Sequence, residues 1–246
     1  MSIETLVDLE GMQNAGRITR AVLEAMKQAV RPGMTTFELD QVARRVLERH
    51  QARSAPMLVY GFPGYTCISV NDEVVHGVPG HRELKQGDLL KLDVTVERGG
   101  YMADACETVS VGAAASAAER LANCARRAFA IALREVRIGA RAYDIGTAVQ
   151  REVRRAGYSV VRDLTGHGIG RTIHEAPTIP NHRDPRCSTT LTDGLVFTIE
   201  PIIAAGGTQT RTSADGWTIR TRDRSLAAHH EHTVMVTKAG PVLLTA

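Results

Sequence analysis

Hydrophobic residues recur at helical spacing in four segments of the 246-residue chain. The clearest is TTFELDQVARRVLERH, residues 35–50, whose apolar positions at this spacing are Leu39, Val42, Val46 and Leu47. Thr35 and Glu38 form a capping box at its start. Pro32 and Gly33 separate it from the helix before it. We expect the other three helices at about residues 10–30, 115–136 and 142–156.

Segments rich in β-branched residues and bounded by turn signals predict strands in both halves of the chain. The first half contains TCISVN, DLLKLDVTVERGG and YMADACETVSVG, at residues 66–71, 88–100 and 101–112. Gly99 and Gly100 predict a hairpin turn between the last two. The second half contains YSVVRDL, GLVFTIEP, WTIRT and EHTVMVT, at residues 158–164, 194–201, 217–221 and 231–237. The polar, glycine-rich residues 205–216 are expected to form a loop.

The two halves resemble each other in sequence. Residues 31–45 align with residues 137–151 at a constant offset of 106, and the identical pairs are Arg31/Arg137, Gly33/Gly139 and Arg45/Arg151. Amphipathic helices can resemble one another by chance, but each copy here also follows a helix and precedes strands. We therefore predict a duplicated ααββ unit in an α+β fold, with two halves completing one sheet and a cleft between them. No boundary interrupts the chain, so residues 1–246 are expected to form a single domain.

Composition and charge argue against several classes of protein. The 30 basic and 27 acidic residues are well mixed, the net charge is +3, and no nucleic-acid-binding motif is present. We expect no DNA binding, and no more than a weak electrostatic affinity for RNA or the ribosome. The four cysteines form no C-x-x-C pair, and no segment has the features of a signal peptide or a membrane span. The sequence predicts a cytoplasmic protein with reduced thiols and no membrane contact.

Three common catalytic motifs are absent from the sequence. HEAPT is not H-E-x-x-H, because Thr178 occupies the fourth position after His174. GHGIGRTI lacks the spacing of a dinucleotide-binding loop and the lysine of a phosphate loop, and no G-x-S-x-G nucleophile elbow occurs. These absences argue against thermolysin-like proteases, dinucleotide-binding proteins and serine hydrolases of that type.

The stretch GHGIGRTIHEAP, residues 166–177, contains two histidines, His167 and His174, and three alternating glycines. Each glycine weakens a helix and leaves a strand without a side chain to pack. We therefore expect irregular, close-packed backbone in this stretch.

Four acidic residues occur in strands that are otherwise apolar: Asp93, Asp104, Glu200 and Glu231. Any one of them could be a surface acid or half of a buried salt bridge, because a buried carboxylate is costly unless it is paired or binds a metal. Together with His167 in one cleft, the four would suit two divalent ions that share bridging carboxylates. Oxygen-rich ligation favours Mn, Fe(II), Co or catalytic Zn, and such a centre would support metal-assisted hydrolysis.

Five motifs taken together are more specific than any one of them. They are NDEVVHGVPG, LDVTVERGGYMAD, GHGIGRTIHEAP, FTIEP and RSLAAHHEHTVMVT. Their order and spacing resemble those of the methionine aminopeptidases, in particular the short bacterial type I form, over about residues 5–240. The resemblance implies the pita-bread fold, in which pseudo-twofold halves and a curved antiparallel sheet covered by helices surround a dinuclear metal site. It also implies removal of the N-terminal methionine from nascent proteins when the second residue is small.

By this resemblance the metal ligands fall on Asp93, Asp104, His167, Glu200 and Glu231. Asp104 and Glu231 would bridge the ions, and Glu200 would also transfer a proton from the nucleophilic water. His76 would contact the substrate near the scissile bond, and His174 would hydrogen-bond the substrate carbonyl. The glycines around His167 would let the backbone approach the metals and the peptide. The histidines that flank Glu231 are expected to lie on the surface and not to bind metal; they are His229, His230 and His232.

The methionine pocket is expected to have a partly aliphatic wall. Phe62, Cys67 and Trp217 match wall positions of the family. Val59 and Ile173 stand where bacterial members often carry aromatic residues. An aliphatic wall still suits a flexible thioether.

Two other functions are compatible with parts of the pattern. Proline-specific aminopeptidases or dipeptidases of the same fold share the GHGIG and HE pattern, but they usually carry an extra N-terminal domain and lack EHT around the last glutamate. A non-catalytic pita-bread binding protein would typically have lost metal ligands, and all five are present here. The leading hypothesis is a monomeric metalloaminopeptidase that acts on the N-terminal peptide of nascent proteins.

Overall fold

Each half of the chain begins with two long helices and continues mainly with strands. The computed structural model describes residues 1–113 and 115–246. Its helices are α1 (Leu6–Ala29), α2 (Thr36–Arg49), α3 (Ala55–Tyr60), α4 (Ser116–Leu133) and α5 (Ala142–Arg155). The strands of the first half are β1 (Arg53–Ser54), β2 (Cys67–Val70), β3 (Glu73–Val75), β4 (Leu89–Arg98) and β5 (Tyr101–Ser110). Those of the second half are β6 (Ser159–Val160), β7 (Gly166–Gly168), β8 (Glu175–Ile179), β9 (Val196–Ile199), β10 (Ile202–Ala204), β11 (Thr210–Thr212), β12 (Ile219–Thr221), β13 (Ala227–His229), β14 (Glu231–Thr237) and β15 (Gly240–Leu243).

The four helices expected from the sequence are present, and local capping explains where they start. α1 begins at Leu6 and not at residue 10, because Thr5 and Asp8 form a capping box there. The capping box of Thr35 and Glu38 at the start of α2 is confirmed. α4 ends at Leu133 and α5 at Arg155, slightly before their expected ends. Among the described helices, none combines the length and hydropathy that crossing a membrane requires.

Several short elements differ from the expectations. The sequence does not predict α3, which Ser54 caps and which ends at Gly61 in the left-handed conformation. Residues 205–216 are not entirely loop, because β11 pairs with β12. The GHGIG segment is also more regular than expected, since β7 pairs with both β8 and β9. The expected irregularity is found in residues 169–174, which form neither helix nor strand, and in a register shift between His167 and Gly168.

The predicted duplication extends to the backbone hydrogen bonds of the two helix–turn–helix units. Gly33 and Gly139 both adopt positive φ, at 81° and 87°. The Gly33 N–H donates to the Leu84 carbonyl at 2.8 Å, and the Gly139 N–H donates to the Leu191 carbonyl at 2.9 Å. The residues just before α2 and α5 also form matching isolated β-bridges to those downstream segments. The two units therefore turn and anchor their second helices in the same way.

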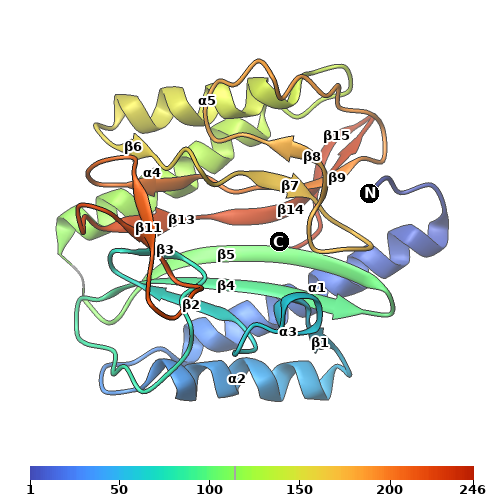
Figure 1. Cartoon of the computed structure of the whole chain (residues 1–246). Helices are drawn as coiled ribbons and strands as arrows, with labels where there is room; N and C mark the ends of the chain where they lie inside the picture. Colours follow the sequence, from blue (N-terminus) through green and yellow to red (C-terminus); the bar gives the residue numbers. More distant parts are fainter. Residues whose placement is uncertain (114) are drawn as a thin grey trace.

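One large antiparallel sheet contains strands from both halves. Its order is β1-β4-β5-β14-β9-β7-β8, with β2 on β4 and β15 on β14. β5 and β14 join the halves through the pairs Cys106–Glu231 and Ala105–His232. In Figure 1 these strands cross the middle of the molecule. In this view α1 and α2 lie toward the bottom, and α4 and α5 lie toward the top. Two three-stranded sheets, β13-β10-β6 and β11-β12-β3, complete the structure of the described residues.

The turn between β4 and β5 fixes how two of the acidic residues face each other. Gly99 and Gly100 connect these strands with φ of 62° and 83°, which confirms the predicted hairpin. Positive φ at both central residues is the geometry that matches the twist of paired strands, and glycine adopts it without strain. The resulting register places Asp104 opposite Thr95 and Asp93 opposite Cys106.

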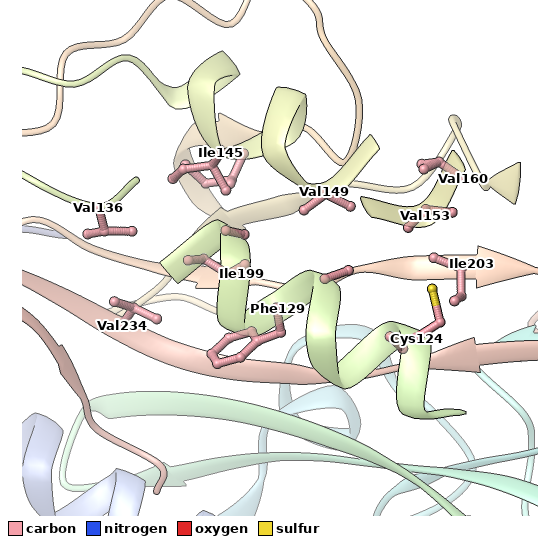
Figure 2. Packing of buried hydrophobic residues seen from close by; sticks show 14 of the residues in the cluster. Cys124, Phe129, Val136, Ile145, Val149, Val153, Val160, Ile199, Ile203 and Val234 are labelled. Atoms are coloured by element: carbon pink, nitrogen blue, oxygen red, sulfur yellow. The ribbon is translucent and has the colours of Figure 1, made fainter. Parts of the chain in front are cut away.

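Alternation along the strands separates an apolar face from a polar one. On β4, Leu92 and Val94 pack in a cluster with residues of α1 and α2, whereas Asp93 lies on the opposite face. In the second half, Ile199 and Val234 pack beneath α4 and α5, as Figure 2 shows. Both helix pairs therefore cover the apolar face and leave the polar face for the site.

Lys91 lies on the polar face of β4, two residues before Asp93, and is completely buried. Its Nζ donates to the backbone carbonyl of Asn71 at 2.8 Å and lies 3.5 Å from that of Leu89. Burial lowers the pKa of Lys91 from 10.5 to about 7, although Glu73 opposes the shift. The folded protein therefore favours the neutral amine between about pH 7 and 10.

We predict that Lys91 makes stability rise with pH in this range. The unfolded chain binds the lysine proton up to about pH 10 and the folded chain only up to about pH 7, so the unfolding free energy increases between these values. Lys91→Met should remove that share of the slope, which is at most about 1.4 kcal/mol per pH unit. Urea unfolding of the metal-free proteins at pH 7, 8, 9 and 10 measures it. Exposed Lys85→Met is the control, and a slope shared by all three proteins would contradict the prediction.

Candidate metal centre

Five neighbouring strands of the large sheet each bring one potential ligand to the polar face. In sheet order these residues are Asp93 on β4, Asp104 on β5, Glu231 on β14, Glu200 directly after β9 and His167 on β7. The predicted ligands are thus far apart in the sequence but adjacent in the sheet. The cleft expected between the halves is formed where β5 meets β14.

The side chains converge closely enough to share cations. Donor atoms of Asp104, His167 and Glu231 lie within 4.8 Å of one another. His167 Nε2 lies 3.5 Å from Glu200 Oε1. Buried Oδ1 of Asp104 and Oε1 of Glu231 have no hydrogen-bond partner. Because an unpartnered buried carboxylate oxygen is costly, this donor set fits a divalent cation better than a metal-free network.

Burial controls the ionisation of these groups. It raises the pKa of Asp93, Glu200 and Glu231 well above the usual range, and neighbouring carboxylates add to the shift of Asp93 and Glu231. Burial also raises the pKa of Asp104 to about 6, against hydrogen bonds from Thr95 and Asp93 that lower it. The pKa of His167 falls to about 3 because the ring is buried. A neutral imidazole beside carboxylates that resist ionisation until a cation arrives is typical of a metal site.

Hydrogen bonds from neighbouring strands orient the ligands. His167 Nδ1 lies 3.0 Å from the Gly168 carbonyl, to which it donates in the tautomer that leaves Nε2 free to bind a cation. The Thr198 hydroxyl accepts from the His167 backbone N–H at 3.1 Å and donates to Glu200 Oε1 at 2.8 Å. The Thr233 hydroxyl accepts from the backbone N–H of Asp104 and donates to the backbone carbonyl of the same residue. His167 and Asp104 are therefore each held by a residue of the neighbouring strand, and Glu200 by a residue of its own strand.

The glycines of GHGIG serve strand packing, which corrects the expectation that they make room for metals and peptide. A Cβ on Gly166 would lie 2.5 Å from the Thr198 carbonyl oxygen, and one on Gly168 would lie 2.1 Å from that of Ala176. Only glycine permits such close approach of neighbouring backbones. This packing folds the β7–β8 hairpin tightly enough to bring the His167 and His174 rings within 4.2 Å, centroid to centroid.

The two histidines predicted to contact substrate both line a cavity beside the ligands. The cavity has a volume of about 280 Å³. His76 adopts a left-handed backbone conformation, with φ of 56°, which is uncommon outside glycine and occurs often at functional sites. His174 Nδ1 is hydrogen-bonded to the Tyr60 hydroxyl at 2.5 Å. Burial lowers the pKa of both histidines, so both rings are neutral at pH 7.

The apolar wall of the cavity agrees with the prediction except at Val59. Phe62, Cys67, Ile173 and Trp217 line it, and the Phe62 and Trp217 rings meet edge to face at 5.3 Å. Val59 does not line the cavity and is 42% exposed. The reason is α3, which turns Pro56 and Tyr60, four residues apart, toward the cavity. A helical reading of APMLVY could have identified Tyr60, which the sequence prediction missed.

The expectation of three surface histidines around Glu231 is wrong. His229 is only 2% exposed, and His230 and His232 are half-buried against Phe129. His229 Nε2 lies 3.2 Å from Glu231 Oε2 and 3.9 Å from Glu200 Oε2. His229 therefore lies against two of the predicted ligands, and its strand β13 pairs with β10, a long-range contact that the local sequence does not reveal.

Residues 10–238 match metallopeptidase family M24. The chain belongs to this family. Methionine aminopeptidase 2 of Bacillus subtilis is 42% identical over 240 residues, which cover 97% of this chain and 96% of that protein. The crystal structure of methionine aminopeptidase from Rickettsia prowazekii has 40% identity and a TM-score of 0.96, with full coverage of both chains. The predicted resemblance to bacterial methionine aminopeptidases is thus confirmed, and membership of M24 implies the use of divalent metal.

A more distant neighbour shows how widely this M24 fold is shared. Prolidase from Pyrococcus furiosus matches 99% of this chain with a TM-score of 0.80, at 22% identity, and 65% of the prolidase chain is covered. At that identity only the fold is shared. The neighbours confirm the expected α+β pita-bread architecture, with its curved antiparallel sheet and helices.

We predict that the metal-free M24 protein loses stability as pH rises from about 4 to 6. The folded-state pKa of Asp104 is raised from 3.8 to about 6, so its contribution is complete below pH 3.8 and is lost as pH passes about 6. Asp104→Asn should reduce this loss, by on the order of 2 kcal/mol. Saturating Mn(II) should reverse the trend, because bound ligands must be deprotonated. Thermal unfolding with and without Mn(II) measures both effects, and a metal-independent pH profile would refute the assignment.

Proposed function

We propose that this chain removes the N-terminal methionine from nascent proteins whose second residue is small. The observation that carries the proposal is one cavity with two kinds of lining. Carboxylates and imidazoles of the sheet line it together with the apolar side chains of Phe62, Cys67, Ile173 and Trp217. An apolar pocket beside a hydrolytic centre suits a substrate with an apolar first side chain and a scissile bond directly after it.

We propose that two divalent ions bind this centre. Asp93, Asp104, His167, Glu200 and Glu231 would hold them, with Asp104 and Glu231 shared between the ions. Co, Mn, Fe(II) and Zn are the candidate metals, because the donor set is rich in oxygen and contains imidazole. When bound, such ions polarise a carbonyl and lower the pKa of a water molecule.

Protein side chains would carry out the proton transfers and the substrate contacts of peptide hydrolysis. Glu200 would accept a proton from the attacking water and return one to the leaving amine, as a general base and acid. His76, at the cavity wall, would contact the substrate beside the scissile bond. His174 would donate a hydrogen bond to the carbonyl oxygen as it gains negative charge.

Tyr60 would set the tautomer of His174. Burial raises the pKa of Tyr60, so its hydroxyl keeps its proton and can donate to His174 Nδ1. A neutral His174 that accepts at Nδ1 carries its own proton on Nε2. His174 would then present Nε2–H as a donor to the substrate.

We also propose a setting for this activity. The chain would act in the cytoplasm as a monomer, and its +3 charge would give at most a weak affinity for the ribosome. Residues 1–246 would work as a single catalytic domain, because strands of both halves contribute ligands to one sheet. Prolidase-like activity is disfavoured, since similarity to the prolidase extends to the fold alone. A non-catalytic role is disfavoured because the full set of ligands is retained.

We predict that the protein reconstituted with Mn(II), Co(II) or Fe(II) releases methionine from Met-Ala-Ser and acts poorly on Leu-Ala-Ser and X-Pro peptides. Glu200→Gln should lower kcat by roughly 10² or more, because the proton acceptor is lost. Exposed Glu119→Gln is the matched control and should retain activity. Preferential X-Pro cleavage would replace the proposal with a prolidase-like function, and no turnover with any metal would favour a binding protein.

We predict that Tyr60→Phe lowers kcat by about tenfold, equivalent to about 1.4 kcal/mol, with little change in KM. The loss would follow from a His174 ring free to adopt the wrong tautomer or orientation. Tyr65→Phe is the control, because Tyr65 does not line the cavity. Steady-state kinetics on Met-Ala-Ser separates kcat from KM, and a Tyr60→Phe effect confined to KM would contradict the tautomer argument.

A further inference from the structure

His229 is a buried histidine whose Nε2 lies beside the carboxylates of two predicted ligands, Glu200 and Glu231. It is 2% exposed, and neither Nδ1 nor Nε2 has a hydrogen-bond partner. A buried polar group without a partner costs free energy, so its presence requires a compensating interaction. At the adjacent His230 only Nδ1 is buried without a partner, and its ring packs edge to face on Phe129 at 5.2 Å.

The His229 ring is directed at the two acidic residues of the second half. Donor atoms of Glu200, His229 and Glu231 all lie within 4.8 Å of one another. His229 Nε2 is 3.2 Å from Glu231 Oε2. Two atoms bound to one ion at about 2.1 Å, at tetrahedral or octahedral angles, lie roughly 3.0–3.4 Å apart. The separation of Nε2 and Oε2 is therefore that of two ligands of one ion.

The cluster contains two similar groups of three residues that share one residue, and Asp93 belongs to neither group. Asp104, His167 and Glu231 form the first, and Glu200, His229 and Glu231 form the second. Each group contains one imidazole, and Glu231 belongs to both. The two imidazoles come from different strands, β7 and β13. Glu200 lies between them, with Oε1 near His167 and Oε2 near His229.

We propose that His229 is a second imidazole ligand of the metal centre, on the ion held by Glu200 and Glu231. This inference rests on the proposed dinuclear centre and adds a nitrogen ligand to the single-imidazole set that the family resemblance implies. A second nitrogen donor shifts preference toward metals that bind imidazole well, such as Zn, Co and Fe(II), and away from Mn(II).

The test compares His229→Gln with wild type, with His230→Gln as the neighbouring control and His167→Gln as the positive control. Calorimetric titration of the metal-free proteins with Co(II) and Mn(II) gives affinity and stoichiometry. We expect His229→Gln to weaken binding of one Co(II) ion at least tenfold and to affect Mn(II) less. Proton NMR of the Co(II) proteins should show strongly shifted imidazole N–H signals from two rings in wild type and from one ring in His229→Gln. His230→Gln should match wild type.

Folding is checked separately by thermal unfolding of the metal-free proteins. His229→Gln should leave that midpoint unchanged or raise it, because it removes a buried ring with no partner. Should Gln distort the site, His229→Leu, which has no donor atom, must show the same loss of one ion. Wild-type affinity and two shifted imidazole signals in His229→Gln would overturn the inference. Unchanged metal binding in His167→Gln would instead overturn the proposed centre itself.

Discussion

The structure depends on the burial of acidic side chains on one face of an antiparallel sheet. Four carboxyls and two imidazoles converge where β4, β5, β14, β9 and β7 lie side by side, and oxygens of Asp104 and Glu231 have no protein partner. Such an arrangement is unfavourable unless cations occupy it, so the fold must hold the ligands together against their mutual repulsion. It does so by covering the opposite face with four helices, which form large hydrophobic clusters with the strands. Packing on the apolar face of the sheet therefore stabilises the fold, whereas the buried acidic side chains on the opposite face destabilise it.

The duplication explains how a continuous ligand row arises from two half-chains. Each half contributes a helix pair anchored by the same turn, with Gly33 and Gly139 in equivalent hydrogen bonds. The halves meet at β5 and β14, where Cys106 pairs with Glu231. Asp104 and Glu231 thus come from the two strands at the junction, which places them centrally in the row. Asp104 and Glu231 therefore have predicted ligands on both sides of them in the sheet order, whereas Asp93 and His167 are the outermost of the five.

The sequence predicts those features that local chemistry determines. The Thr35–Glu38 capping box and the Gly99–Gly100 turn are short-range signals, and both are confirmed. The five ligands could be selected because acids in apolar strands and a shared motif order point to them. Features that depend on long-range packing were out of reach. His229 appears in a polar run, HHEH, and only the covering elements reveal that it is buried. Tyr60, to which the sequence analysis assigned no role, lines the cavity in place of Val59, because residues 55–60 form the short helix α3.

His167 and His174 show how one short hairpin gives two histidines different chemistry. Their rings are in contact, and burial keeps both neutral. The two rings differ in the group that is hydrogen-bonded to Nδ1. For His167 it is the carbonyl of Gly168, which leaves a lone pair on Nε2 facing Glu200. For His174 it is the hydroxyl of Tyr60, and where this hydroxyl donates, as proposed above, the proton of His174 lies on Nε2. One ring is thereby prepared to bind a cation and the other to donate to an oxygen. The different roles proposed for His167 and His174 follow from the hydrogen-bond partners of Nδ1. They require no difference in burial or in sequence motif.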